Sequence, residues 1–246
     1  MKHNLFLQRH PWDHWFYPLL LAPAWLAIVM GFGPKLVATL AGQVPVAPLY
    51  LHVHAFIFGG WMLLLSAQTL LVQRGRLDLH RKLGLLSAVL VPLVVGSGLL
   101  TAIWMNQHHY DTGALTRPAF ISIQWGGMLV FAVAAGLALA WRHQPHIHKR
   151  LIWLATIELL GAGFGRWLGR GLRPYFGDSG LEFWFTVFLG TNLMLLVCVV
   201  YDLASRRRVH PVWLYGIPLQ IGMQAVAVWL FKSPFWLPIA LKLIDR

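Results

Sequence analysis

Residues 83–105 read LGLLSAVLVPLVVGSGLLTAIWM, a run without one Asp, Glu, Lys or Arg. A helix needs roughly 20 apolar residues to cross the hydrocarbon core of a bilayer. Six further runs have the same character, and the segments between them are too short for a domain outside the membrane. The sequence therefore predicts an all-α integral membrane protein, a single bundle of about seven transmembrane helices over residues 1–246. The expected spans are residues 17–37, 52–72, 83–104, 119–141, 151–168, 183–201 and 212–231.

The composition excludes several other classes of protein. Of the 246 residues 58% are hydrophobic and 11% are charged, whereas a soluble domain has roughly 25% charged residues. The 13% aromatic content argues against disorder, and a lone cysteine, Cys198, argues against a disulfide scaffold. The net charge of +12 does not indicate nucleic acid as a partner, because the basic residues stand in short clusters between apolar runs. The expected partner is the lipid bilayer.

The basic clusters also predict an orientation. RGR (74–76), RK (81–82), KR (149–150) and RRR (206–208) fall on the side of the N-terminus, which holds 12 of the 20 Lys and Arg residues. Loops rich in Lys and Arg stay in the cytoplasm, so we expect a cytoplasmic N-terminus, an external C-terminus and a bacterial inner membrane. The first fifteen residues lack the apolar core and small-residue cleavage site of a signal peptide, so we expect the first span to be retained.

Polar residues inside the spans are the first candidates for function. A charged side chain near the centre of a membrane helix costs roughly 2.5–3.5 kcal/mol on insertion scales. Glu158 and Arg166 are eight residues apart in the fifth span, which puts them about two turns apart on a similar face. Asn192 in the sixth span could join them from a neighbouring helix. This set fits a structural clamp between two helices, or a proton-relay or substrate-contact site.

Histidines at the predicted outer rim form a candidate metal site. His52 and His54 open the second span, and His108 and His109 follow the third. Neutral imidazole is a common ligand of copper, zinc and iron. The LHVHAF stretch has no basic neighbour to repel a cation, so we expect a metal here rather than at the inner rim, although residues i and i+2 of a helix lie roughly 200° apart. The alternative is that these histidines are interfacial anchors.

A second histidine group lies at the predicted cytoplasmic rim. LHRKL (79–83) and IHKRL (147–151) share one pattern, which places His80 and His148 at one depth, with His210 following RRRV. Two histidines from different helices at one depth can ligate haem b axially. The adjacent Arg and Lys residues disfavour a cation, so the alternatives are membrane anchors, or contacts for a lipid phosphate or a haem propionate.

Several longer motifs carry a resemblance. The chain resembles a family of uncharacterised bacterial multi-pass membrane proteins, and more remotely domain-of-unknown-function and b-type-cytochrome-like membrane proteins and cytochrome oxidase assembly factors. The resemblance implies a shared residue set, with Glu158 and Asn192 as departures from the family pattern. The matching motifs are GFGP (31–34), LHVHAFIFGGWMLLLSAQTLLV (51–72), LHRKLG (79–84), HKRLIWLATIELL (148–160), GRW (165–167) and YDLASRRRVHP (201–211). The implied residues are His52, His54, Gln68, His80, Arg81, His148, Arg150, Arg166, Asp202 and His210.

Three functions follow from these residues. The leading hypothesis is an inner-membrane protein that binds haem or a transition metal in electron transfer or redox-cofactor handling, with a homodimer or a redox partner, and with Trp61, Trp104 and Trp125 lining a flat cofactor. The second is a small transporter or sensor that uses the Glu158, Arg166 and Asn192 site. The third is a metal-dependent membrane hydrolase, which the predicted distance between Glu158 and the histidines disfavours.

Overall fold

Helices make up all the regular structure that the computed structural model describes, in residues 6–8, 10–113, 117–176 and 180–245. The all-α prediction is therefore confirmed. The helices are α1 (Asp13–Leu19), α2 (Leu21–Leu40), α3 (Leu49–Gln73), α4 (Leu77–Gly84), α5 (Ser87–Asp111), the 3₁₀ helix η1 (Pro118–Phe120), α6 (Ile121–Ala140), α7 (Pro145–Leu159), α8 (Gly161–Phe176), α9 (Gly180–Arg206), α10 (Pro211–Lys232) and α11 (Trp236–Leu243).

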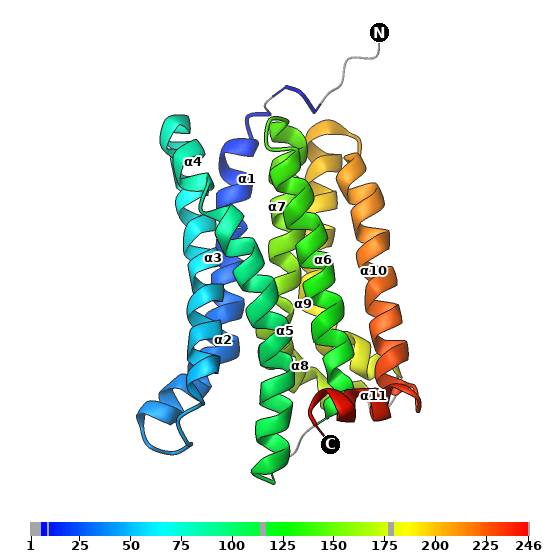
Figure 1. The fold of residues 1–246 in the computed structure, drawn as a ribbon. Coiled ribbons are helices and arrows are strands. Elements are labelled where there is room, and N and C mark those ends of the chain that lie inside the picture. The colour runs from blue at the N-terminus through cyan, green and yellow to red at the C-terminus, as the bar shows by residue number, and fades with distance from the viewer. Residues whose placement is uncertain (1–5, 9, 114–116, 177–179, 246) are drawn as a thin grey trace.

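The long helices run up and down between the two ends of one bundle, and the termini lie at opposite ends (Figure 1). In the described chain six helical stretches are long and apolar enough to cross a membrane, counting α1 and α2 as one. The helix α7 and the first half of α8 pass the same test together and make a seventh span if they are counted as one, although they meet at a bend of 48° next to Leu160.

The bend corrects the prediction of a straight fifth span over residues 151–168. Glycines at 161, 163 and 165 weaken the helix where α8 begins, because glycine costs about 1 kcal/mol relative to alanine inside a helix. They also let α8 approach α2 closely. A Cβ atom added at Gly163 would lie 2.6 Å from the carbonyl oxygen of Ala27. The same glycines thus allow both the bend between α7 and α8 and the close backbone packing of α8 against α2.

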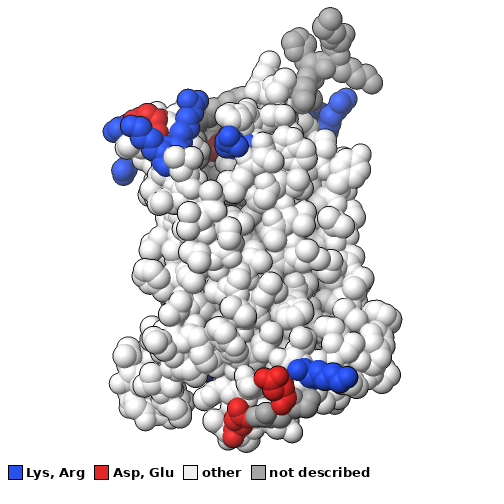
Figure 2. All heavy atoms as spheres, viewed as in Figure 1, with Lys and Arg blue, Asp and Glu red and all other residues white. Residues whose placement is uncertain are grey.

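The two ends of the bundle differ in charge. Lys and Arg side chains gather at the end that holds the N-terminus, and the side of the molecule between the ends is almost free of charge in this view (Figure 2). We call the end with the N-terminus and the loops after α3, α6 and α9 the basic end, and the other the opposite end. Large apolar side chains such as Phe56, 83% exposed, cover the sides. The chain is therefore a multi-pass membrane protein whose sides face lipid.

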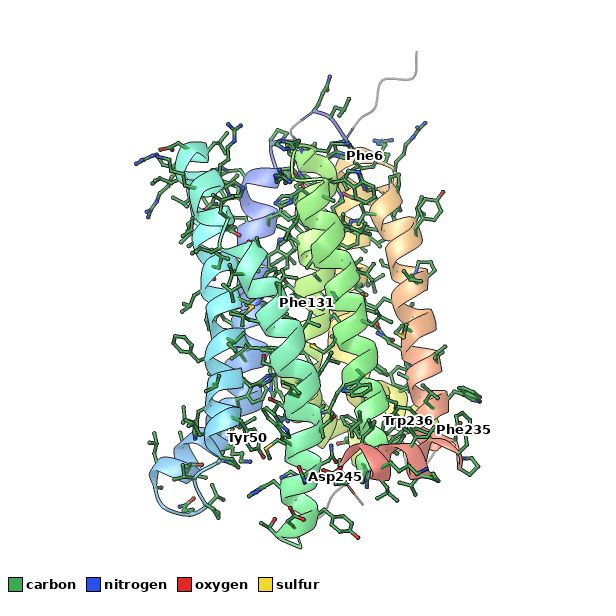
Figure 3. All side chains as sticks on the ribbon, viewed as in Figure 1. Phe6, Tyr50, Phe131, Phe235, Trp236 and Asp245 are labelled. Atoms are coloured by element: carbon green, nitrogen blue, oxygen red, sulfur yellow. The ribbon has the colours of Figure 1, made fainter. Side chains whose placement is uncertain are left out.

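Helix α7 lies at the centre of the bundle. Its buried Trp153, Leu154 and Ile157 belong to the main apolar core. From α3, Trp61 packs edge-on against Phe131 of α6 (Figure 3) and donates a hydrogen bond from its indole nitrogen to an α7 threonine. This contact ties α7 to α3 beside α6, and α7 carries His148, Arg150 and Glu158.

Candidate functional site

His80 and His148 reach one corner of the basic end from two helices. α4 is a short helix with Asp78 in its first turn and Arg81 and Lys82 in its last turn, which suits the helix dipole. α7 begins at Pro145, a favourable first helical residue because it has no N–H to leave unpaired. The two histidines therefore stand in different helical contexts. His148 lies in the first turn of α7, whereas His80 belongs to a separate helix before α5.

The two imidazole rings lie near one another in an edge-to-face arrangement. Their centroids are 6.4 Å apart and their planes are nearly perpendicular, at 87°. The Nδ1 atom of His148 lies 2.8 Å from the carbonyl oxygen of Ala138. A carbonyl oxygen can only accept, so this Nδ1 carries the proton and the Nε2 atom keeps a lone pair. His148 therefore presents an unprotonated nitrogen away from Ala138.

Several polar atoms at this corner have no hydrogen-bond partner among the described residues. In the described part of the chain, His80 Nδ1 and both amide atoms of Gln68 are buried without a hydrogen-bond partner. Gln68 belongs to α3, and a Cβ atom at Gly84 would lie 3.5 Å from its Nε2 atom, so its side chain packs against the end of α4. A buried polar group without a partner costs about 1–3 kcal/mol. Buried polar atoms of this kind can bind an ion or a water molecule.

The electrostatics of this corner keep His80 neutral. Burial lowers the pKa of His80 below its ordinary value, the main chain of Gln68 opposes this effect, and the charge of Arg81 adds to it. A neutral imidazole offers a lone pair, which a protonated one cannot. Arg81 opposes a bound cation as it opposes a proton, so the ability of His80 to act as a ligand rests on its unpaired nitrogen and on the nearby ring of His148.

His210 does not share this corner. Its Nδ1 atom accepts a hydrogen bond from the main-chain N–H of Val212 at 3.1 Å, which caps the start of α10. Its Nε2 atom therefore carries the proton, and it donates to Nδ1 of His146 at 3.0 Å. Both ring nitrogens of His210 are occupied. The structure thus joins two of the three histidines predicted for a cofactor and gives the third a structural role.

The outer histidines stay apart. The hydroxyl of Tyr50 donates to the carbonyl oxygen of Trp104, which fixes how α3 and α5 run alongside each other. Since the two helices are antiparallel, His54 lies one turn deeper than that contact and His108 one turn further out, about 12 Å apart along the axis. His52 is held at 3.1 Å from the carbonyl oxygen of Ala47.

The predicted outer metal cluster of His52, His54, His108 and His109 is therefore not assembled. His108 and His109 lie next to each other, with ring centroids 6.1 Å apart, but on one helix. Across the described ranges, no three side chains of His, Cys, Asp or Glu converge on one point. A metal site of this protein would thus rest on two such side chains and on other donors.

Asp13 is the centre of an ionic network at the basic end. Its carboxylate accepts hydrogen bonds from the Tyr201 hydroxyl at 2.5 Å and from Arg206 Nη2 at 2.7 Å, and it lies 3.2 Å from Lys149 Nζ. The Asp13 side chain is only 6% exposed. The network joins the first helix of the chain to α7 and α9, so it fixes the basic end of the bundle.

Arg150 and Asp202 form a second, fully buried ion pair. The guanidinium donates from Nε and Nη2 to both carboxylate oxygens, and both side chains are 0% exposed. The main-chain N–H of His210 adds a third hydrogen bond to Asp202, at 3.2 Å. Phe6 covers the pair, with its ring 5.1 Å from the Arg150 guanidinium carbon (Figure 3). Three residues implied by the family resemblance, Arg150, Asp202 and His210, thus meet in one structural tie.

A polar layer crosses the middle of the bundle. Glu158 Oε2 accepts a hydrogen bond from Gln220 Nε2 of α10 at 2.6 Å. One turn further along α10, Gln224 exchanges two hydrogen bonds with Asn192 of α9, at 3.0 and 3.2 Å. The structure therefore links Glu158 and Asn192 to neighbouring glutamines of α10, whereas the sequence suggested Asn192 as the link between Glu158 and Arg166.

Arg166 is not part of this layer. It donates to the carbonyl oxygen of Ala162 at 2.8 Å, and its guanidinium lies 4.8 Å from the ring centre of Phe32. The bend after α7 explains the difference, because residues eight apart share a face only along a straight helix. The sequence gives a usable signal for the true partners. Gln220 and Gln224 stand four residues apart in an apolar run, hence on one helix face.

Comparisons with known proteins add no further constraint. No protein-family model, curated protein or solved structure matches the chain. The functional argument therefore rests on the geometry of the described residues.

Proposed function

We propose that this membrane protein binds a transition-metal ion, or the iron of haem b, between His80 and His148, in electron transfer or redox-cofactor handling at a bacterial inner membrane. The supporting observation is the 6.4 Å separation of the two rings. A metal lies about 2.0 Å from an imidazole nitrogen, so two rings on one metal have centroids about 5 Å apart in tetrahedral coordination and about 6 Å apart when they lie on opposite sides of the metal. Rings from two helices at this spacing can share a metal without a large movement of either helix.

The surroundings of the pair support the same proposal. The hydrogen bond from His148 Nδ1 to a main-chain carbonyl is the usual outer-shell contact that orients a metal-binding histidine. Gln68 offers a buried amide oxygen without a partner as a further donor. Imidazole with an oxygen donor suits copper, zinc and iron.

An ion is favoured over haem b at this pair. The tryptophans expected to line a flat cofactor lie elsewhere: Trp61 bonds a threonine of α7, Trp125 bonds the main chain of α5, and Trp104 packs on a tyrosine near the opposite end. The side chain of Gln68 also lies against Gly84 beside the pair. A porphyrin would need more room between these helices than a single ion.

The position of the pair suits exchange with a partner. It lies at the basic end, whose exposed Lys and Arg side chains would attract a redox partner or a metal donor with an acidic surface. Such a partner would approach from the cytoplasm if the loops obey the positive-inside rule.

The test is a metal analysis and an absorption spectrum of the purified protein. We expect stoichiometric copper, zinc or iron after loading, and a tenfold or larger loss of bound metal in the double variant His80→Ala/His148→Ala. The matched control is His52→Ala/His54→Ala, which removes the histidines that the sequence favours and should keep the metal. Circular dichroism and gel filtration check that both variants fold.

Each other result has a defined meaning. A Soret band that disappears only in the His80 and His148 variant would assign haem b to the pair. Loss of metal only in the His52 and His54 variant would move the site to the opposite end. Absence of both a Soret band and stoichiometric metal from the wild-type protein would overturn the proposal.

A further inference from the structure

A water-sized cavity lies beside Glu158 in the middle of the bundle. Its volume is about 10 Å³, enough for one water molecule. Helices α6, α7, α9 and α10 contribute to its wall, and no charged side chain other than Glu158 is among the lining residues. These are Ile123, Gly126, Gly127, Val130, Glu158, Phe188, Gln220, Met223, Gln224 and Ala227.

Glycine makes room for the carboxyl group. A Cβ atom added at Gly127 would lie 2.9 Å from Glu158 Oε1, too close for an ordinary contact. The carboxyl group can therefore lie against α6 only because residue 127 has no side chain. Glu158 lies ten residues after His148 on α7, about 15 Å along the helix, so this site is separate from the histidine pair and does not depend on the function proposed there.

The site has more acceptors than donors. Gln220 is 1% exposed and donates its Nε2 to Glu158, while its own Oε1 is buried without a partner in the described residues. Gln124, one turn before Gly127 on α6, likewise has a buried Oε1 without a partner. A hydrogen-bond acceptor without a donor in an apolar bundle is costly, and a proton or a water molecule supplies the missing donor.

Among the described residues that line the cavity, Glu158 is the one charged side chain. The polar side chains that the hydrogen bonds join in this layer are amides, Asn192 from α9 and Gln220 and Gln224 from α10. Arg166 of α8 donates to the carbonyl oxygen of Ala162 and lies beside the ring of Phe32. An ionised carboxylate inside a membrane needs a partner of opposite charge or a wet cavity.

We propose that Glu158 is a proton-binding site inside the membrane bundle, and that the cavity holds the water molecule that exchanges this proton. On uptake, the cavity water accepts a proton that comes from the solvent, and one O–H bond of the resulting hydronium breaks as a carboxylate oxygen of Glu158 takes the proton, which leaves neutral water behind. On release, the O–H bond breaks, the proton returns to the water, and the Gln220 Nε2 donor stabilises the carboxylate. The polar layer thereby binds and releases a proton, in addition to holding the helices together.

The test is infrared difference spectroscopy of the full-length protein as pH is varied. We expect a carbonyl band of a protonated carboxyl group that grows as pH falls. The band should disappear in Glu158→Gln and persist in the matched control Glu182→Gln, which removes the other glutamate of the chain. In Gln220→Leu, where the amide donor is lost, the midpoint of the band should move up by about one pH unit or more.

A second design keeps the test valid if Glu158→Gln does not fold. Carbon-13 labelled glutamate in the Glu182→Gln protein leaves Glu158 as the only labelled carboxyl side chain, so its band is assigned without altering it. A labelled carboxylate band at every pH at which the protein stays folded overturns the proposal. A protonated band that does not change with pH also overturns it, because it indicates a fixed structural acid.

Discussion

At the scale of single residues, His210 connects a loop to a helix through both nitrogens of one ring. Its Nδ1 atom accepts from the main-chain N–H of Val212 and so caps α10, and its Nε2 atom donates to His146. The residue is only 2% exposed. Burial, and then the charge of Arg150, lower the pKa of His210 from 6.5 to about 3. Protonation would put a hydrogen on Nδ1 and remove the acceptor that caps α10.

Acid should therefore destabilise the fold through His210. Below about pH 6.5 the unfolded chain binds a proton that the folded chain excludes until about pH 3, so this contribution is complete above pH 6.5 and is lost as pH falls through that window. The loss is at most about 1.4 kcal/mol per pH unit. Thermal unfolding in detergent between about pH 7.5 and 4.5 measures it. His210→Asn keeps a capping acceptor but does not titrate, so its melting temperature should fall less than that of the wild type.

The partners of single residues are the part of the site that the sequence predicts least well. Helical spacing places Glu158 and Arg166 on one face only if the helix is straight, and a bend separates them. The contact of Glu158 with Gln220 spans 62 positions in the chain, so no local pattern encodes it. His80 and His148 are a partial success, because a shared motif places both at one depth and the structure brings their rings together.

At the scale of elements, α2 and α8 are in backbone contact. A Cβ atom added at Gly31 would lie 2.5 Å from the carbonyl oxygen of Gly163 and 2.7 Å from its Cα. Small residues at such crossings let membrane helices pack through van der Waals contact. Because the atoms in the way belong to the main chain, no side-chain rotation relieves the clash.

Gly31→Ala should therefore force the two helices apart. Overpacking of this kind costs about 1–3 kcal/mol, which we expect as a lower melting temperature in detergent. Gly136→Ala in α6 is the matched control, because its Cβ atom would meet nothing within 4 Å. It should be neutral or slightly stabilising. Equal losses in the two variants would mean that the contact with α8 is not the reason why alanine is disfavoured at residue 31.

The helices themselves are largely predictable from the sequence. The lengths of the apolar runs encode the spans, so the run at 52–72 becomes α3, Leu49–Gln73, within a few residues. Two features are not encoded in this way. LHRKL reads as the start of a span but forms the separate helix α4, and the fifth span bends after Leu159. Both depend on packing against distant parts of the chain, which hydropathy does not record.

At the scale of the whole molecule, an odd number of crossings gives the two termini different surroundings. The N-terminus lies at the basic end and the C-terminus at the opposite end (Figures 1 and 2). The positive-inside rule then predicts a cytoplasmic basic end.

Reporter fusions test this orientation. We expect green fluorescent protein to be fluorescent when fused after Arg208, at the basic end, and dark when fused after the C-terminus. Alkaline phosphatase at the same two sites should give the reverse result, active only after the C-terminus. A fluorescent fusion after the C-terminus, with an inactive phosphatase there, would contradict the predicted orientation.

The ionic tie at Asp13 has a consequence for biosynthesis. Asp13 belongs to α1, but its partner Arg206 follows 193 residues later in the chain. At roughly 5–20 residues per second, the acidic group is exposed to the translocation machinery for about 10–40 s before that partner exists. Lys149 of α7 can pair with Asp13 earlier, but the Tyr201 and Arg206 contacts complete the network only when α9 has been synthesised, so a chain that stops before α9 keeps only part of the tie that holds α1.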